Sequence, residues 1–253
     1  MAVLPERGTD PPEDVFRVFA LNFALDIETI PRDLRGESRK IQEYVWERAL
    51  RRGPEPAPDV TLDDYLRAPD SDGLEPVRHR IELYMTLRPE FGHVVCIGMG
   101  HDARGRGELE LKALTARRVE DERLILQGFW EVLRARRDWR FVTYNGLAFD
   151  VPFLLRRSIY LGVEPTTGLP TRPFALESHF DVMRALANWE RADSVRLDIV
   201  AELLSLSKSP AGMEGSQVLA LWRAGRVEEI EAYCLGDVRL VYDIFLRIEP
   251  YFR

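Results

Sequence analysis

The sequence lacks several features that would place the protein in a specialised class. No stretch approaches the run of about 18 apolar residues that a membrane helix needs, and the opening MAVLPERGTDPPED does not have the basic-then-apolar order of a secretory leader. Cys96 and Cys234 are far apart, which excludes a disulfide framework and a Cys-x-x-Cys metal or redox site. We therefore expect a cytoplasmic protein with reduced thiols and no membrane partner.

Positive charge is also scarce. The 253 residues include 42 Asp and Glu against 35 Lys and Arg, a formal charge of −7, and only Lys40, Lys112 and Lys208 are lysines. A protein that coats nucleic acid through bulk charge needs clustered Lys and Arg, so this class is disfavoured. With 45% hydrophobic and 30% charged residues, the composition is typical of a globular chain with a substantial core.

Apolar patterns predict an α/β fold. The nearly continuous apolar run 15–25 predicts a strand buried on both faces that ends at Asp26. Further strands are expected at 93–99 and 108–114, as a hairpin, and at 140–144 and 179–181, while helical periodicity covers 120–136, 150–160, 194–206, 216–224 and 227–248. This order predicts a mixed five-stranded sheet flanked by helices, with antiparallel strands first and helical crossovers afterwards.

The segment 31–90 differs from the rest of the chain. Helical patterns at 38–50 and 74–87 surround the Pro-rich stretch PEPAPD. We interpret this segment as an insertion between the core segments 15–30 and 91–248 of one domain that spans residues 1–253.

A glycine pattern at 98–103, GMGHDA, matches the dinucleotide-binding motif G-x-G-x-x-A. That motif needs a helix directly after it, because the helix N-terminus holds the pyrophosphate. A turn and another strand are expected instead, so we set the dinucleotide hypothesis aside.

Two carboxylates stand at the end of the first predicted strand. Strand side chains alternate, so Asp26 and Glu28 point to one side while Ile27 faces the core. Adjacent carboxylates repel each other, and a hard divalent cation is a common reason to place them together. A strand end that reaches solvent is the alternative explanation.

Two later segments carry further acids. Asp150 follows the turn at 144–149, YNGLAF, and is the first residue of a predicted helix. Helix capping alone would account for an Asp at this position. If the preceding strand runs parallel to the first, Asp150 lies at the same sheet edge as Asp26. Tyr233 and Asp237 lie one turn apart on the last helix, on a face expected to point inward, so Asp237 needs an Arg or a metal as its partner.

Together these groups resemble the motifs of the DEDD, or DnaQ-like, 3′–5′ exonuclease superfamily, in the subgroup with Tyr in its third motif. The stretches LRPEFGHVVCIG, HFDVM and AGRVEEIEAYCLGDV are similar to predicted exonucleases that resemble the proofreading domain of family-B DNA polymerases. The resemblance extends from about Phe19 to Leu246 and is weakest over 31–89. It implies a ribonuclease-H-like fold and metal-dependent hydrolysis of a phosphodiester at a 3′ end.

The resemblance also implies roles for the acidic residues. Two Mg²⁺ or Mn²⁺ ions about 3.5–4 Å apart would activate water and stabilise the attacking and leaving oxygens. By analogy, Asp26 would bridge both ions, Glu28 and Asp237 would complete one site, and Asp150 would hold the second ion. Tyr233 would hydrogen-bond the attacking water; with an ordinary pKa of about 10 it is a poor base at neutral pH, so an orienting role is expected.

Three further residues match positions near the 3′-terminal nucleotide in the family: Thr29, Asn145 and Phe149. An aromatic side chain there would separate the last bases by stacking, although Phe149 could equally belong to the core. Asp181, in HFDVM, either follows the family pattern or only caps the next helix.

The expected substrate is the 3′ end of DNA, single-stranded, from which a free-standing exonuclease releases nucleoside 5′-monophosphates. An exoribonuclease with the same site is the nearest alternative, because a contact with the 2′-hydroxyl cannot be read from sequence. A catalytically idle nucleic-acid-binding or scaffold module is the alternative from another class, and the sequence leaves the oligomeric state open. A short 3′ end entering a metal-filled cleft does not require a basic surface, which reconciles this function with the acidic charge.

Overall fold

The computed structural model describes residues 21–51, 60–102, 108–135, 139–207 and 214–252. Its centre is a five-stranded sheet of order β3-β2-β1-β4-β5. The strands are β1 (Leu21–Pro31), β2 (Gly92–His101), β3 (Glu110–Thr115), β4 (Trp139–Thr143) and β5 (His179–Asp181). β1, β2 and β3 pair antiparallel, whereas β4 pairs parallel with both β1 and β5. The mixed, ribonuclease-H-like sheet expected from the sequence is confirmed.

The first strand does not end at Asp26 as expected. β1 continues to Pro31 because β2 pairs with it from Phe23 to Pro31, with an irregularity between Glu28 and Thr29. The prediction was wrong because acidic residues are poor strand formers by themselves, whereas a long partner strand holds them extended. The predicted residues 15–20 lie outside the described ranges.

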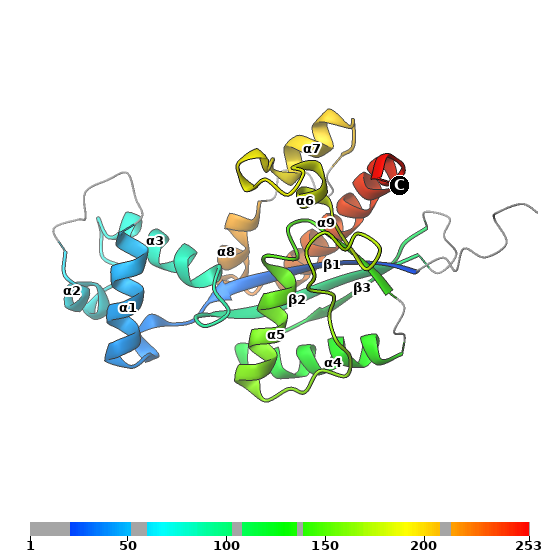
Figure 1. Cartoon of the computed structure of the whole chain (residues 1–253). Coiled ribbons are helices and arrows are strands. Elements are labelled where there is room, and N and C mark those ends of the chain that lie inside the picture. The colour runs from blue at the N-terminus through cyan, green and yellow to red at the C-terminus, as the bar shows by residue number, and fades with distance from the viewer. Residues whose placement is uncertain (1–20, 52–59, 103–107, 136–138, 208–213, 253) are drawn as a thin grey trace, which may run out of the picture.

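Helices cover both faces of the sheet (Figure 1). On one face lie α4 (Glu122–Arg134) and α5 (Asp150–Leu161); on the other lie α6 (Val182–Leu186), α7 (Leu197–Leu203), α8 (Val218–Arg223) and α9 (Val227–Ile248). Short 3-10 turns occupy Leu34–Gly36, Val119–Asp121, Arg191–Asp193, Gly215–Gln217 and Glu249–Phe252. Within the described ranges, none of the helices combines the length and apolar character required to cross a bilayer.

Alternation along β1 divides the core into two layers. Phe23, Leu25 and Ile27 pack among side chains of α4 and α5. Ala24 points the other way and packs in the cluster that contains Val238 of α9. Asp26 and Glu28 follow Ala24 at intervals of two, so the face of the sheet under α9 receives both carboxylates.

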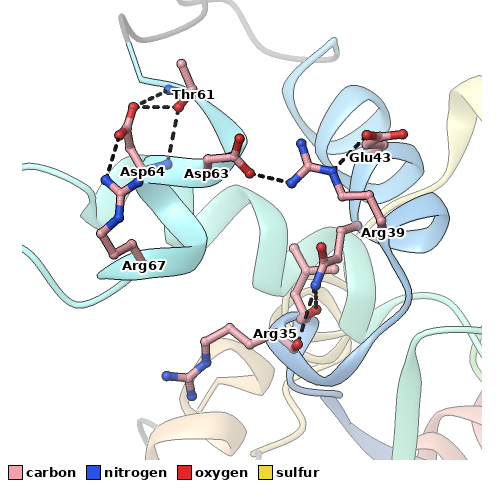
Figure 2. A network of polar contacts seen from close by, with 9 residues as sticks. Arg35, Arg39, Glu43, Thr61, Asp63, Asp64 and Arg67 are labelled. Carbon is pink, nitrogen blue, oxygen red and sulfur yellow. Dashed lines mark hydrogen bonds and ion pairs between the residues drawn. The ribbon is translucent and has the colours of Figure 1, made fainter.

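The segment after β1 forms a helical unit beside the sheet (Figure 1). It consists of α1 (Arg39–Leu50), α2 (Leu62–Arg67) and α3 (Glu75–Thr86), with an apolar core of its own. Arg39 of α1 bonds Glu43 at 2.8 Å and also pairs with Asp63 of α2 (Figure 2). The short helix α2 was not predicted from periodicity; its sequence signal is the capping box formed by Thr61 and Asp64.

Candidate active site

A glycine on β2 allows the last helix to approach the sheet. Gly98 lies opposite Asp26 in the β1–β2 register. A Cβ at Gly98 would lie 2.7 Å from Sγ of Cys234 and 2.9 Å from a methyl carbon of Val238, both on α9. The glycine that matched a dinucleotide motif therefore serves helix packing, and it places α9 directly over the carboxylates of β1.

Asp150 reaches β1 where β4 has ended. The parallel β1–β4 pairing covers only Leu21–Ala24 of β1. Beyond that point the backbone N–H of Ile27 donates to Oδ1 of Asp150 at 3.0 Å. Asp150, the first residue of α5, thus bonds the residue that stands between Asp26 and Glu28 in β1. This is the sheet edge at which the parallel arrangement predicts it.

The loop before Asp150 is held by a buried carboxylate. Asn145 has a left-handed φ of 65°, and Asp181, which is fully buried, accepts the backbone N–H groups of Asn145 at 2.9 Å and Leu147 at 3.0 Å. Asp181 also accepts the N–H of Arg184 at 3.2 Å, as a cap of α6. Asp181 therefore both caps the next helix and fastens the loop that carries Asp150, a role that sequence reasoning missed.

The carboxylates influence one another strongly. Burial, and then the negative charges of Glu28, Asp150 and Asp237, raise the pKa of Asp26 well above its ordinary value of 3.8. Burial also raises the pKa of Asp150 to about 7, and the charge of Asp181 adds to this effect. Glu28, Asp150 and Asp237 are only 8%, 3% and 6% exposed. The four acids from three motifs therefore lie together, with Asp26 half-buried and the other three buried.

Tyr233 lies beside this cluster, on the same face of α9 as Asp237. Burial, followed by the charges of Asp237 and Glu28, raises the pKa of Tyr233 above its ordinary value of 10.0. Its hydroxyl therefore keeps its proton at neutral pH.

Cys234 is the second residue that sequence reasoning missed, although its place inside the Tyr-x-x-x-Asp motif was a signal. Its Sγ lies 3.6 Å from the backbone oxygen and 3.6 Å from Oδ2 of Asp26. One ligand atom each from Asp26, Glu28 and Cys234 lie within 4.8 Å of one another. Burial and a hydrogen bond with Cys96 raise the pKa of the Cys234 thiol, so the thiol keeps its proton and remains a donor to Asp26.

The three expected substrate residues have different surroundings. The Thr29 hydroxyl donates to the backbone oxygen of Thr86 at 3.0 Å, which ties β1 to α3. Oδ1 of Asn145 accepts from Arg184 at 3.4 Å. The half-buried ring of Phe149 packs against Phe153 with the ring centroids 5.4 Å apart, directly before Asp150.

The mixed five-stranded sheet flanked by helices defines a ribonuclease-H-like domain. The chain belongs to the family described as predicted 3′–5′ exonucleases related to the exonuclease domain of PolB, whose model matches residues 86–252, more than half of the chain.

Its relatives include DNA polymerases at low identity. The frog virus 3 (isolate Goorha) protein named "Putative DNA polymerase 060R" is 26% identical over 251 aligned residues, and the alignment covers 84% of this chain and 24% of the relative. A DNA polymerase of Thermococcus aggregans is 27% identical over 143 residues, 50% of this chain and 8% of the relative. One from Pyrococcus glycovorans is 22% identical over 140 residues, 50% of this chain and 18% of the relative. The chain thus spans a quarter or less of the length of these relatives.

Proposed function

We propose that the protein is a 3′–5′ exonuclease that hydrolyses phosphodiester bonds at the 3′ end of single-stranded DNA and releases nucleoside 5′-monophosphates. The observation that carries this proposal is the convergence of the acids: ligand atoms of Asp26 and Glu28 lie within 4.8 Å of each other, and Asp150 accepts the N–H of Ile27, the residue between them, at 3.0 Å. The negative charges of Glu28, Asp150 and Asp237 all act on Asp26. Buried carboxylates that destabilise one another are expected where a cation is bound. The family membership and the polymerase relatives support the choice of nucleic acid as substrate.

The donor set fits two Mg²⁺ or Mn²⁺ ions, since both prefer carboxylate oxygens. Asp26, Glu28, Asp150 and Asp237 would hold the ions. When bound, such ions supply a lowered pKa for water and positive charge for the developing oxyanions.

The remaining tasks fall to the chain's own side chains. The protonated Tyr233 hydroxyl orients the attacking water as a hydrogen-bond partner, because a phenol with a raised pKa is no base at neutral pH. Cys234 donates to Oδ2 of Asp26 and limits the orientations of that carboxylate. Asp181 holds the loop that positions Asp150 and Asn145. Phe149 and Asn145 would meet the 3′-terminal nucleotide.

We also propose that residues 1–253 form one exonuclease domain, with 31–90 inserted into a core of 15–30 and 91–248. The hydrogen bond from Thr29 to Thr86 and the contact of Phe91 with the insertion's apolar cluster support one packed unit.

The test is the release of nucleoside 5′-monophosphates from matched single-stranded DNA and RNA oligonucleotides in the presence of Mn²⁺ or Mg²⁺. We expect DNA to be degraded from its 3′ end. Asp26→Ala should abolish release, because the cations lose their central ligand. Asp243→Asn, a change of a half-exposed acid further along α9, is the matched control and should retain activity.

Three outcomes would contradict the proposal. Equal activity of the Asp26→Ala variant would remove these residues as the site. Absence of heat from Mn²⁺ binding in calorimetry of the purified protein would instead favour an idle binding module. Release from RNA alone would replace DNA by RNA as the substrate.

A further inference from the structure

A large groove lies between the helical insertion and the core, next to the candidate active site. Its volume is about 1010 Å³, at the upper end of the roughly 300–1,000 Å³ typical of ligand sites. One wall is α1, the floor is the segment 87–91, and the other wall begins at Ala148 and Phe149 and follows the first turns of α5. Phe149 directly precedes Asp150 in the chain, so this wall of the groove begins one residue before a member of the carboxylate cluster.

Aromatic rings line this groove from both sides. Tyr44 on α1 is 47% exposed, and its ring centroid is 6.0 Å from that of Phe91. Phe91 is supported from behind by Tyr84, whose ring stacks on it at 6.2 Å with an interplanar angle of 25°. Phe149 stands on the opposite wall. Phe91 itself is only 9% exposed, so Tyr44 is the exposed ring on this side of the groove, and an exposed ring stacks on bases of any sequence.

The charges of the groove suit a phosphate backbone despite the acidic total. The lining includes Glu43, Glu47 and Glu90, and each of these acids pairs with an arginine: Arg39 at 2.8 Å, Arg51 at 3.7 Å and Arg156 at 3.2 Å, respectively.

Two basic side chains that line the groove do not pair with these three acids. Lys40 is exposed on α1, and the guanidinium of Arg88 lies 4.1 Å from the centroid of the Tyr84 ring. Within the described part of the chain, neither Lys40 nor Arg88 forms an ion pair with an acidic side chain of the groove. Positive charge is therefore available in the same groove as the exposed ring of Tyr44.

We propose that this groove binds the single-stranded segment that leads to the 3′ end, with a base stacked on Tyr44 and phosphates against Lys40 and Arg88. The insertion would then serve as a strand guide, continuous with the active site through Phe149. This inference rests on the proposed exonuclease function and extends it to nucleotides upstream of the scissile bond.

The first experiment measures binding without hydrolysis. Oligonucleotides of about 12 nucleotides carry 2-aminopurine either at the 3′ end or several positions upstream, and are bound in EDTA. We expect quenching of the upstream probe to be lost in the Lys40→Ala/Tyr44→Ala variant and the affinity to fall about tenfold, while quenching of the 3′ probe persists. Tyr251→Ala/Lys112→Ala, which changes an 85% exposed ring and a lysine outside the groove, is the matched control.

The second experiment separates strand guidance from chemistry. The p-nitrophenyl ester of thymidine 5′-monophosphate has no upstream nucleotides, so the variant should hydrolyse it with unchanged kcat/KM while its kcat/KM for the oligonucleotide falls about tenfold. Equal losses on both substrates, unchanged oligonucleotide binding, or a change of oligomeric state in the variant would overturn the proposal. If the wild-type protein hydrolyses neither substrate, the exonuclease function fails, whereas the binding experiment still decides on the groove.

Discussion

Two carboxyl groups of the site have pKa values above those of the same groups in water. Asp150 lies buried with an N–H of β1 as a partner, yet its pKa is raised to about 7 because burial outweighs that hydrogen bond. The pKa of Asp26 is also raised, by burial and then by the negative charges of the neighbouring carboxylates. In metal-free protein both carboxylates therefore keep their protons to a higher pH than in water, and a cation would compete with these protons.

Asp150→Asn should make the metal-free protein relatively more stable as the pH rises. The pKa of Asp150 is about 7 when folded against 3.8 in its ordinary state, so between these values the folded state binds more protons and wild-type stability falls with rising pH. The Asn variant lacks this penalty, so its melting temperature in EDTA, relative to wild type, should increase from pH 5 to pH 8, as measured by thermal unfolding.

Asp198→Asn is the control with the opposite sign. The hydrogen bond from Arg196 lowers the pKa of Asp198, so removing this carboxylate should bring no gain at pH 8. A pH-independent difference between wild type and Asp150→Asn would contradict the assignment.

At the scale of secondary-structure elements, one buried ion pair joins several of them. Arg157 of α5 binds both carboxylate oxygens of Glu122 of α4, at 2.8 and 2.7 Å, and also donates to the backbone oxygen of Pro89. Glu122 in turn accepts the N–H of Val94 of β2 at 2.9 Å. This network joins α4, α5 and β2 to the end of the insertion, and so fixes the helix whose first residue is Asp150.

Breaking this pair on one side should be costly. Glu122→Gln leaves Arg157, 3% exposed, without its countercharge, and we expect a loss of about 3–5 kcal/mol in the free energy of unfolding, measured by urea denaturation. The double variant Glu122→Leu/Arg157→Leu should lose less than the single variant, because no buried charge remains.

The exposed pair Arg39–Glu43 provides the comparison, since Glu43→Gln should cost far less than Glu122→Gln because water screens the two charges. A cost of similar size at Glu43 and Glu122 would show that burial is not the cause.

At the scale of the whole molecule, acidic charge and nucleic-acid binding are compatible because the contact is short. The formal charge is −7, and the proposed groove offers two cations to phosphate, Lys40 and Arg88. Affinity should therefore rest on stacking and metal binding more than on counterion release.

This predicts a shallow salt dependence. With about two phosphates neutralised, the slope of log K against log salt for single-stranded DNA should be about −1.4, and Lys40→Ala should reduce it to about −0.7. Fluorescence anisotropy over a tenfold range of KCl measures both slopes. A slope steeper than about −4 would indicate an extended basic surface and contradict the short contact.

Much of the fold was predictable because it depends on local patterns. The alternation of Asp26, Ile27 and Glu28, the one-turn spacing of Tyr233 and Asp237, and the range of α9 follow from the periods of strand and helix. The same local rules missed α2 and shortened β1, since six residues show little periodicity and the length of a strand depends on its partner.

The sequence by itself determined which chemical groups are present, in what order, and on which face of their own element. Only the tertiary structure decided which of these groups lie next to one another. The hydrogen bond from Ile27 to Asp150 joins residues 123 positions apart in the sequence, and the contact of Cys234 with Asp26 joins residues 208 positions apart. The loop function of Asp181, the network around Glu122 and the groove beside Tyr44 arise in the same way. The physical reason is that periodicity acts within an element, whereas burial, pKa shifts and cavities arise where elements meet.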